Sequence, residues 1–195
     1  PLVLGGDPAA VAVALPALRS ALPAEVTVAD DIVGAQWTKL LVNQVNALPA
    51  VTGLSVQEVV AHDGLRAVLT RGMRETATVA RAKGLHLARI GAVGPDEVAL
   101  LLSDAPAAGE AVPRALAARM GDVPNPASTL QSIRRGRATE IDALNGVVVA
   151  AGAEGGVATP VNALMVELVH EVERTGEFLD PAAVLARLSA SPAQD

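Results

Sequence analysis

Strand patterns are confined to the first thirty residues, and helix start and stop signals follow one another from Asp31 onward. The opening segment has an apolar run at 2–4, an apolar-periodic stretch to residue 22 and a second strand-like run at 25–28, a pattern that predicts strand, helix and strand. Because two strands around one helix cannot bury both their faces, segment 1–30 is expected to be the edge of a larger α/β sheet. The alternative is a small amino-terminal decoration packed on the helices.

Beyond residue 30 the pattern predicts an all-helical domain over 31–195. Asp31 is expected to cap a helix through about Leu48, with Pro49 and Gly53 interrupting after it. Since 51% of the residues are hydrophobic but only 1% are aromatic, Ala, Val and Leu should form a core of closely packed helices. The stretch 104–109 is small and contains proline, so we expect a mobile connection there. Further helices are expected at 55–62, 63–83, 95–103, 113–120, 126–135, 138–153, 160–174 and 181–189.

Charge and composition disfavour several classes of partner. The net charge is -6, and no run of basic residues alternates with aromatics, so we expect no nucleic-acid partner. The chain has no cysteine and three scattered histidines, which gives no support to a metal site and suits a cytoplasmic protein. No apolar stretch approaches the roughly 20 residues that cross a bilayer, so we expect no membrane span.

The first candidate site is the segment Trp37-Thr38-Lys39-Leu40-Leu41-Val42-Asn43-Gln44-Val45-Asn46. On a helix, Lys39, Asn43 and Asn46 stand at i, i+4 and i+7 and share one face. An ammonium there can act as an acid toward a carbonyl oxygen, and the amides can hold a polyoxygenated substrate. The alternative is an exposed lysine with two solvated asparagines.

The second candidate site runs from Ser128 to Gly146 and reads S-T-L-Q, then G-R-A-T-E-I-D-A-L-N-G. A helix, a glycine stop and a second helix place Glu140 near a helix start, where free amides favour a carboxylate. Glu140 and Asp142 can equally be ordinary first-turn acids. That reading does not explain Asn145-Gly146, because both residues are poor helix formers in the middle of a predicted helix. The glycine suggests close approach by another backbone. A third segment, Thr159-Pro160-Val161-Asn162, is a helix-start signal.

In combination these segments resemble the carboxy-terminal domain of the ketopantoate reductase (2-dehydropantoate 2-reductase) family. The motifs that carry the resemblance are W-x-K-L-x-x-N, S-x-L-Q with G-R-x-T-E-I-D-x-L-N-G, and T-P-x-N, within residues 31–175. The resemblance implies a helical, 6-phosphogluconate-dehydrogenase-like domain. It also implies that residues 1–30 are the closing strand-helix-strand remnant of a Rossmann domain.

The resemblance further implies roles for particular residues. Lys39 falls on the family's catalytic lysine and Glu140 on its active-site glutamate, while Asn43, Asn46 and Ser128 fall on substrate-binding positions. Two departures leave the exact substrate open. The second asparagine follows Lys39 by seven residues rather than eight, and a further substrate-binding asparagine of some members has no counterpart between Ala47 and Val59.

The implied activity is NADPH-dependent reduction of ketopantoate to pantoate in pantothenate and coenzyme A biosynthesis. No G-x-G-x-x-G motif occurs, so the cofactor-binding residues are unknown and the chain is either part of a longer polypeptide or has lost the redox reaction. One alternative is a reductase of another 2-oxo acid or ketone. Another is a non-catalytic binding or dimerisation module, because the alanine-rich stretches 63–83 and 160–174 could pack between two subunits of a homodimer.

Overall fold

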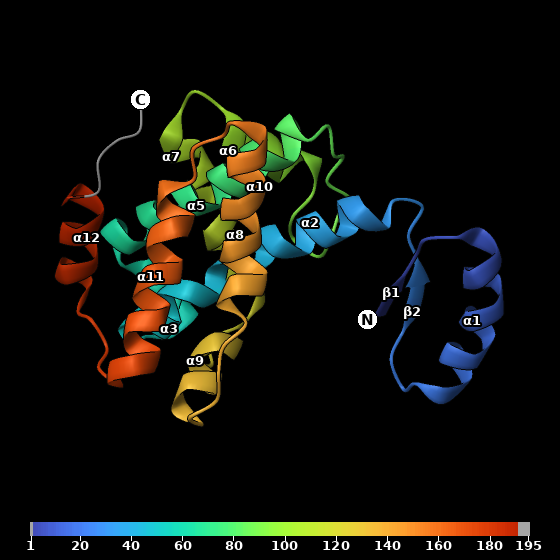
Figure 1. Cartoon of the computed structure of the whole chain (residues 1–195), viewed down its shortest axis with the longest axis horizontal. Helices are drawn as coiled ribbons and strands as arrows, with labels where there is room; N and C mark the ends of the chain where they lie inside the picture. The colour runs from blue at the N-terminus through green and yellow to red at the C-terminus, as the bar shows by residue number, and fades with distance from the viewer. Residues whose placement is uncertain (1, 191–195) are drawn as a thin grey trace.

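The protein is a body of packed helices with a small β-α-β lobe at one side, to which helix α2 joins it (Figure 1). The computed structural model describes residues 2–190. The mostly α fold with a short β-α-β segment is confirmed. The elements are β1 (Leu2–Leu4), α1 (Pro8–Ala21), β2 (Val26–Val28), α2 (Ile32–Asn43), η1 (Gln44–Asn46), α3 (Ala47–Thr52), α4 (Val56–Ala61), α5 (Asp63–Ala82), α6 (Pro95–Leu102), α7 (Pro106–Gly109), α8 (Ala111–Arg119), α9 (Ser128–Arg134), η2 (Asp142–Gly146), α10 (Val147–Gly155), α11 (Pro160–Thr175) and α12 (Pro181–Ala190).

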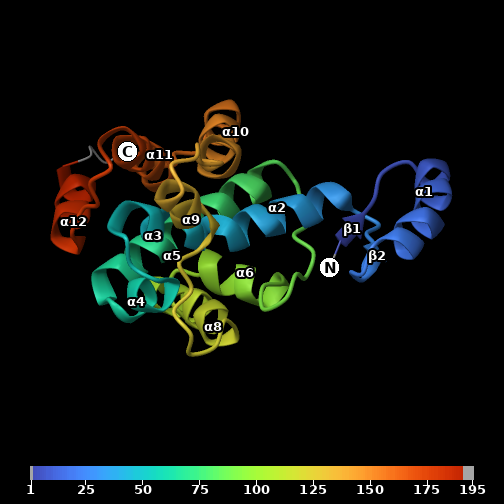
Figure 2. The same ribbon diagram turned by 90° about the horizontal axis from the view of Figure 1, so that it is seen from below.

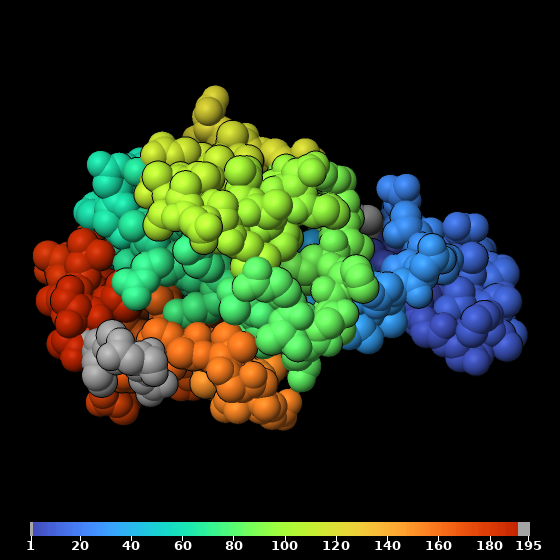
Figure 3. Space-filling model, turned by 90° about the horizontal axis from the view of Figure 1, so that it is seen from above, coloured from blue at the N-terminus to red at the C-terminus, as the bar shows by residue number. Residues whose placement is uncertain are grey.

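The lobe is a two-stranded parallel sheet crossed by one helix. Leu2 pairs with Val26, and α1 makes the crossover between the strands. Asp7 caps α1 by accepting a hydrogen bond from the amide of Ala10 at 2.9 Å, as the Asp-Pro pair indicates. No residue of α1 is buried, and Val13 is 80% exposed. The lobe stands out from the helical body (Figure 3), and Leu2, Val3 and Val28 on its strands are 38–47% exposed.

Helix α5 is the central element of the body. Figure 2 shows α10, α11 and α12 along one side and α4, α6 and α8 along the other, with α5 between them. Leu65, Met73 and Ala77 on α5 are at most 1% exposed. These apolar side chains of α5 therefore pack within the chain.

The segment after Asp31 is not one continuous helix to Leu48. Helix α2 ends at Asn43, a 3₁₀ turn follows at 44–46, and α3 then continues to Thr52. Pro49 lies inside the first turn of α3, where a missing amide hydrogen costs little. The expected stop at Gly53 is confirmed, since Gly53 ends α3 with φ of 74°.

The expected mobile connection at 104–109 is instead partly helical. Residues Pro106–Gly109 form a single helical turn, α7. Gly109 is buried, and a Cβ on it would lie 3.0 Å from Cγ2 of Thr70 on α5. The small residues that suggested mobility permit close packing on the central helix.

Close packing also decides which glycine of α10 can be replaced. A Cβ on Gly152 would lie 2.7 Å from the carbonyl oxygen of Val157, whereas one on Gly155 would meet nothing within 4 Å. We expect Gly152→Ala to lower the free energy of unfolding by roughly 1–3 kcal/mol, because backbone must move to make room. The matched Gly155→Ala should leave it unchanged or raise it slightly. Urea denaturation followed by circular dichroism measures both, and equal effects would contradict the packing argument.

Candidate active site

Lys39, Asn43 and Asn46 form a row that descends from the surface into the body. Lys39 is exposed, Asn43 is half-buried and Asn46 is 9% exposed. Asn43 precedes a 3₁₀ turn whose last residue is Asn46, and side chains three residues apart on such a turn point in the same direction. Within residues 2–190 none of the three side chains has a hydrogen-bond partner, so the row offers one ammonium and two amides to a ligand. The enclosure of Asn46 argues against a pair of freely solvated asparagines.

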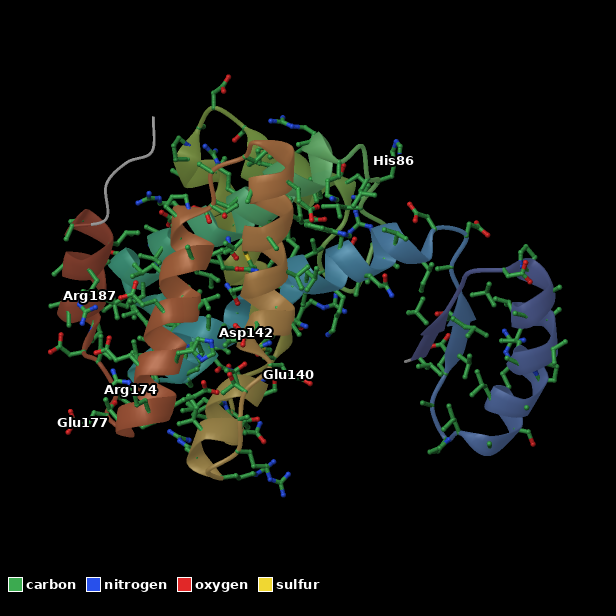
Figure 4. The ribbon with its side chains drawn as sticks, in the orientation of Figure 1. His86, Glu140, Asp142, Arg174, Glu177 and Arg187 are labelled. Carbon is green, nitrogen blue, oxygen red and sulfur yellow. The ribbon has the colours of Figure 1, made fainter. Side chains whose placement is uncertain are left out.

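Glu140 stands at the start of the next candidate segment. Helix α9 ends at Arg134, Gly136 turns the chain with φ of 63°, and Glu140 comes just before the buried Ile141. Its side chain is exposed and has no ion-pair or hydrogen-bond partner in the described residues. In Figure 4 Glu140 and Asp142 lie at the lower end of the α10 column, next to α9. The carboxylate is therefore available to a ligand or to another side chain.

The Asn-Gly pair of this segment lies in a wide turn of π-helix, η2, rather than in ordinary α-helix. Asn145 points inward and is 1% exposed, and its Nδ2 donates to Oε1 of Gln44 at 3.0 Å and to Oδ1 of Asn162 at 3.1 Å. The expected close backbone approach at Gly146 is wrong, because a Cβ there would meet only its own turn at 3.6 Å or more. The sequence irregularity marks the π turn, a feature often found at functional sites.

The Gln44–Asn145 hydrogen bond joins the two candidate segments. Gln44 lies five residues after Lys39, and Asn145 lies five residues after Glu140. The bond therefore links the two segments close to both candidate residues. Element η2 lies against α2 as a result. Lys39 lies in α2 and Glu140 lies two residues before η2, and no ion pair joins them in the part of the chain that is described.

Ser128 is the first residue of α9, and α9 lies against η1. Ser128 is exposed and its hydroxyl has no hydrogen-bond partner among the described residues. The residue before it, Ala127, has φ of 59°, a left-handed value that costs energy for any residue with a Cβ. Asn125 holds this conformation by accepting the Ala127 amide at 2.9 Å. Such strain is often kept where it aims a functional side chain.

The start of α11 is capped by a side chain from α5. Thr159 makes no side-chain cap, and the Glu75 carboxylate instead accepts the amides of Val161 and Asn162 at 2.9 Å each and Nδ2 of Asn162 at 2.7 Å. Burial raises the pKa of Glu75, and these hydrogen bonds only partly oppose that shift. Glu75, Asn162, Asn145 and Gln44 therefore form one buried polar chain behind the candidate site.

Sequence reasoning missed the role of this chain. It treated Asn162 as part of a helix start and did not single out Gln44 or Glu75. A usable signal was present, since a glutamine and an asparagine lie on otherwise apolar helix stripes, and a buried amide needs a partner.

Lys39, Ser128 and Glu140 are exposed, whereas Asn43 and Asn46 lie deeper. Four cavities lined by described residues contain none of these five residues. One of them, of about 530 Å³, lies between α5 and α7. Across 2–190 there is no group of three or more His, Asp or Glu side chains arranged to hold a metal ion. In the same residues no helix combines the length and apolarity needed to cross a bilayer.

The candidate site lies within a segment that matches a known protein family. Residues 31–173, which include the whole candidate site, match the family model "Ketopantoate reductase PanE/ApbA C terminal". The chain belongs to this family. A curated ketopantoate reductase family relative, the 2-dehydropantoate 2-reductase of Caulobacter vibrioides, is 32% identical over 158 residues, which are 80% of this chain and 47% of the relative. The chain thus spans about half the length of the curated relative that it matches.

Solved structures show the same fold. The PanE/ApbA family ketopantoate reductase from Ralstonia eutropha JMP134 superimposes with a TM-score of 0.67 at 32% identity, covering 88% of this chain and 51% of that one. D-mandelate dehydrogenase, solved with NADH and anilino(oxo)acetate, gives 0.64 at 23% identity over 91% and 88% of the two chains. A ketopantoate reductase from Staphylococcus aureus, described as dimeric, gives 0.63 at 16% identity over 91% and 56%. The last two show shared fold alone.

The buried link between the two candidate segments should be measurable as a coupling energy. We expect Gln44→Met and Asn145→Leu each to lower the free energy of unfolding, because each removes one side of the hydrogen bond between Asn145 Nδ2 and Gln44 Oε1. The double variant should lose less than the sum by about 1 kcal/mol or more. A double-mutant cycle from urea unfolding tests this, and additive losses would show that the two residues are not coupled.

Proposed function

We propose that this chain is the substrate-binding half of an NADPH-dependent 2-dehydropantoate 2-reductase, which reduces ketopantoate to pantoate in pantothenate and coenzyme A biosynthesis. The observation that carries the proposal is the unpartnered row of Lys39, Asn43 and Asn46 beside the Glu140 segment, within a chain of the ketopantoate reductase family. Unpaired polar groups at the edge of a packed body suit a small polyoxygenated acid.

Each side chain has a part in this scheme. The Lys39 ammonium donates a proton or hydrogen bond to the ketone oxygen as negative charge develops on it. Asn43, Asn46 and Ser128 hold the carboxylate and hydroxyl groups by directional hydrogen bonds. Glu140 orients Lys39 and the ligand and takes part in proton transfer. Two asparagine departures from the family pattern favour a related 2-oxo acid as the second candidate substrate.

The described residues do not fit a dinucleotide. The turn after β1 holds Gly5-Gly6-Asp7-Pro8, and the Asp7 carboxylate occupies the start of α1, where a pyrophosphate would need free amides. We therefore assign cofactor binding to a nucleotide-binding domain of the intact protein, of which residues 1–30 are the last strand-helix-strand portion. In support, Val28 is 47% exposed and α1 has no buried residue, as expected of a sheet edge without its neighbouring strands.

A direct test of the domain proposal is the length of the natural polypeptide. We expect the coding sequence ahead of Pro1 to specify a strand, a G-x-G-x-x-G turn and a helix, because the parallel pair β1–β2 needs further strands to cover it. Intact mass spectrometry of the protein from its native source should then give a mass well above 19.7 kDa. A mass near that value would leave the chain without a nucleotide-binding domain.

The two lysines of the chain provide a matched test of the chemistry. Lys39→Ala in the intact enzyme should lower kcat with ketopantoate by roughly 100-fold or more, since it removes the proton donor, and should leave the Kd for NADPH nearly unchanged. Lys83 is far along the chain on the end of α5 and pairs with Glu154 at 3.4 Å, so Lys83→Ala should retain full turnover. Steady-state kinetics and cofactor fluorescence titration measure both, and full activity in Lys39→Ala would remove Lys39 from the mechanism.

A further inference from the structure

A histidine on α11 connects to the Glu140 segment through two carboxylates. Nε2 of His170 lies 3.0 Å from Oδ1 of Asp142 in η2, and Nδ1 lies 2.7 Å from Oε2 of Glu173. The other oxygen of Glu173, Oε1, accepts the backbone amide of Thr139 at 2.7 Å. The chain is thus held on both sides of Glu140, at the residue before it and at the residue two after it.

We propose that His170 and Glu173 are positioning residues that hold Glu140 in place for the reaction. The inference rests on the proposed function, because it assigns Glu140 a part in that reaction. Glu140 has no side-chain partner in residues 2–190, so its direction depends on the backbone that carries it. The contacts from α11 reach the segment at the Thr139 amide and at the Asp142 side chain. Within the segment, Oγ1 of Thr139 also accepts the Ile141 amide at 3.3 Å.

The geometry requires a particular protonation state of His170. Each ring nitrogen faces a carboxylate oxygen, and an ionised carboxylate can only accept, so both nitrogens must carry hydrogen. Only the imidazolium satisfies both contacts at once. The neutral ring has one hydrogen and must break or weaken one of them.

The pKa directions agree with this requirement. Hydrogen bonds to Glu173 and then to Asp142 raise the pKa of His170 above its ordinary value of 6.5. Burial alone would raise the pKa of Glu173, but hydrogen bonds from His170 and Thr139 lower it overall. A raised histidine pKa means that the contact is complete below pH 6.5 and is lost as the pH rises through the higher folded-state pKa.

Other elements packed on α11 do not bring competing charges to His170. Helix α3 has no titratable side chain. Several charged groups of the remaining neighbours are engaged elsewhere: Arg187 of α12 with Glu167 and Glu171, Glu154 of α10 with Lys83, and Glu75 of α5 with the start of α11. Asp142 and Glu173 are therefore the ionised side chains that set the protonation of His170.

The experiment compares three variants of the intact enzyme with the wild type. His170→Gln is neutral at every pH, His170→Arg stays charged and keeps two donors, and Glu173→Gln keeps an acceptor for Thr139 while removing its charge. His62→Asn is the control, because it removes another imidazole and asparagine can still cap α5 where His62 accepts the Leu65 amide. Amide exchange of Thr139 and the pH profile of kcat are the two measurements.

In the wild type, kcat should fall as the pH rises through the raised pKa of His170. His170→Gln should lower kcat roughly tenfold with less change in KM, because Glu140 is misplaced rather than absent, and should abolish that inflection. His170→Arg should restore most of kcat, also without the inflection. Glu173→Gln should move the inflection to lower pH, and Thr139 should exchange roughly tenfold faster in His170→Gln. His62→Asn should match the wild type in both measurements.

Two results would overturn the inference. One is a His170→Gln variant in which the Thr139 amide exchanges at the wild-type rate and the pH profile of kcat is unchanged. The other is His170→Arg with kcat as low as His170→Gln. If His170→Gln does not fold, the shift in Glu173→Gln decides instead, and an unmoved inflection counts against the proposal. A wild-type enzyme that does not reduce ketopantoate would refute the proposed function alone, because Thr139 exchange would still report whether His170 holds the segment.

Discussion

The arrangement of the helical body depends on one buried chain of amides and a carboxylate that runs from α2 to α5. Asn145 is its centre, since its Nδ2 reaches Gln44 on one side and Asn162 on the other. Asn162 passes the connection to the Gly72 carbonyl and the Glu75 carboxylate. Apolar packing alone tolerates sliding of one helix along another, whereas buried polar groups lose their partners when the register changes. This buried polar chain therefore fixes the register between the Lys39 segment and the Glu140 segment.

Specific backbone features make this buried chain of hydrogen bonds possible. A regular α-helix would point Asn145 in a different direction, and the wider π turn of η2 places its amide between its two partners, Gln44 and Asn162. The 3₁₀ turn η1 does the same for Gln44 at the end of α2. Gly72 admits the glutamine, because a Cβ there would lie 3.3 Å from Oε1 of Gln44. Small residues and irregular turns thus serve one purpose, the close approach of polar groups within an aliphatic core.

Much of this fold could be read from the sequence. Cap and stop residues are local signals, so Asp31 and Gly53 mark helix ends correctly. The polar row at Lys39 and Asn43 follows from helix periodicity alone. The break at Gln44 did not follow, because it reflects a partner that lies 101 residues away. The capping of α11 by Glu75 has the same cause, since Glu75 lies 86 positions before the Val161 amide that it accepts and takes the place of a Thr159 side-chain cap. Interactions between distant segments carry no local pattern.

The buried polar chain and the row that begins at Lys39 differ in how many of their polar groups have hydrogen-bond partners in the protein. Gln44 and Asn145 are enclosed and mostly paired, with Nε2 of Gln44 and Oδ1 of Asn145 lacking partners within the described residues. Asn46 is nearly as enclosed, yet its amide has no protein partner and still reaches solvent. The Asn46 amide is therefore available to a ligand, which would take the place of water at it. A polar row that the protein leaves without partners beside the Glu140 segment supports a binding site more strongly than a fully paired row would.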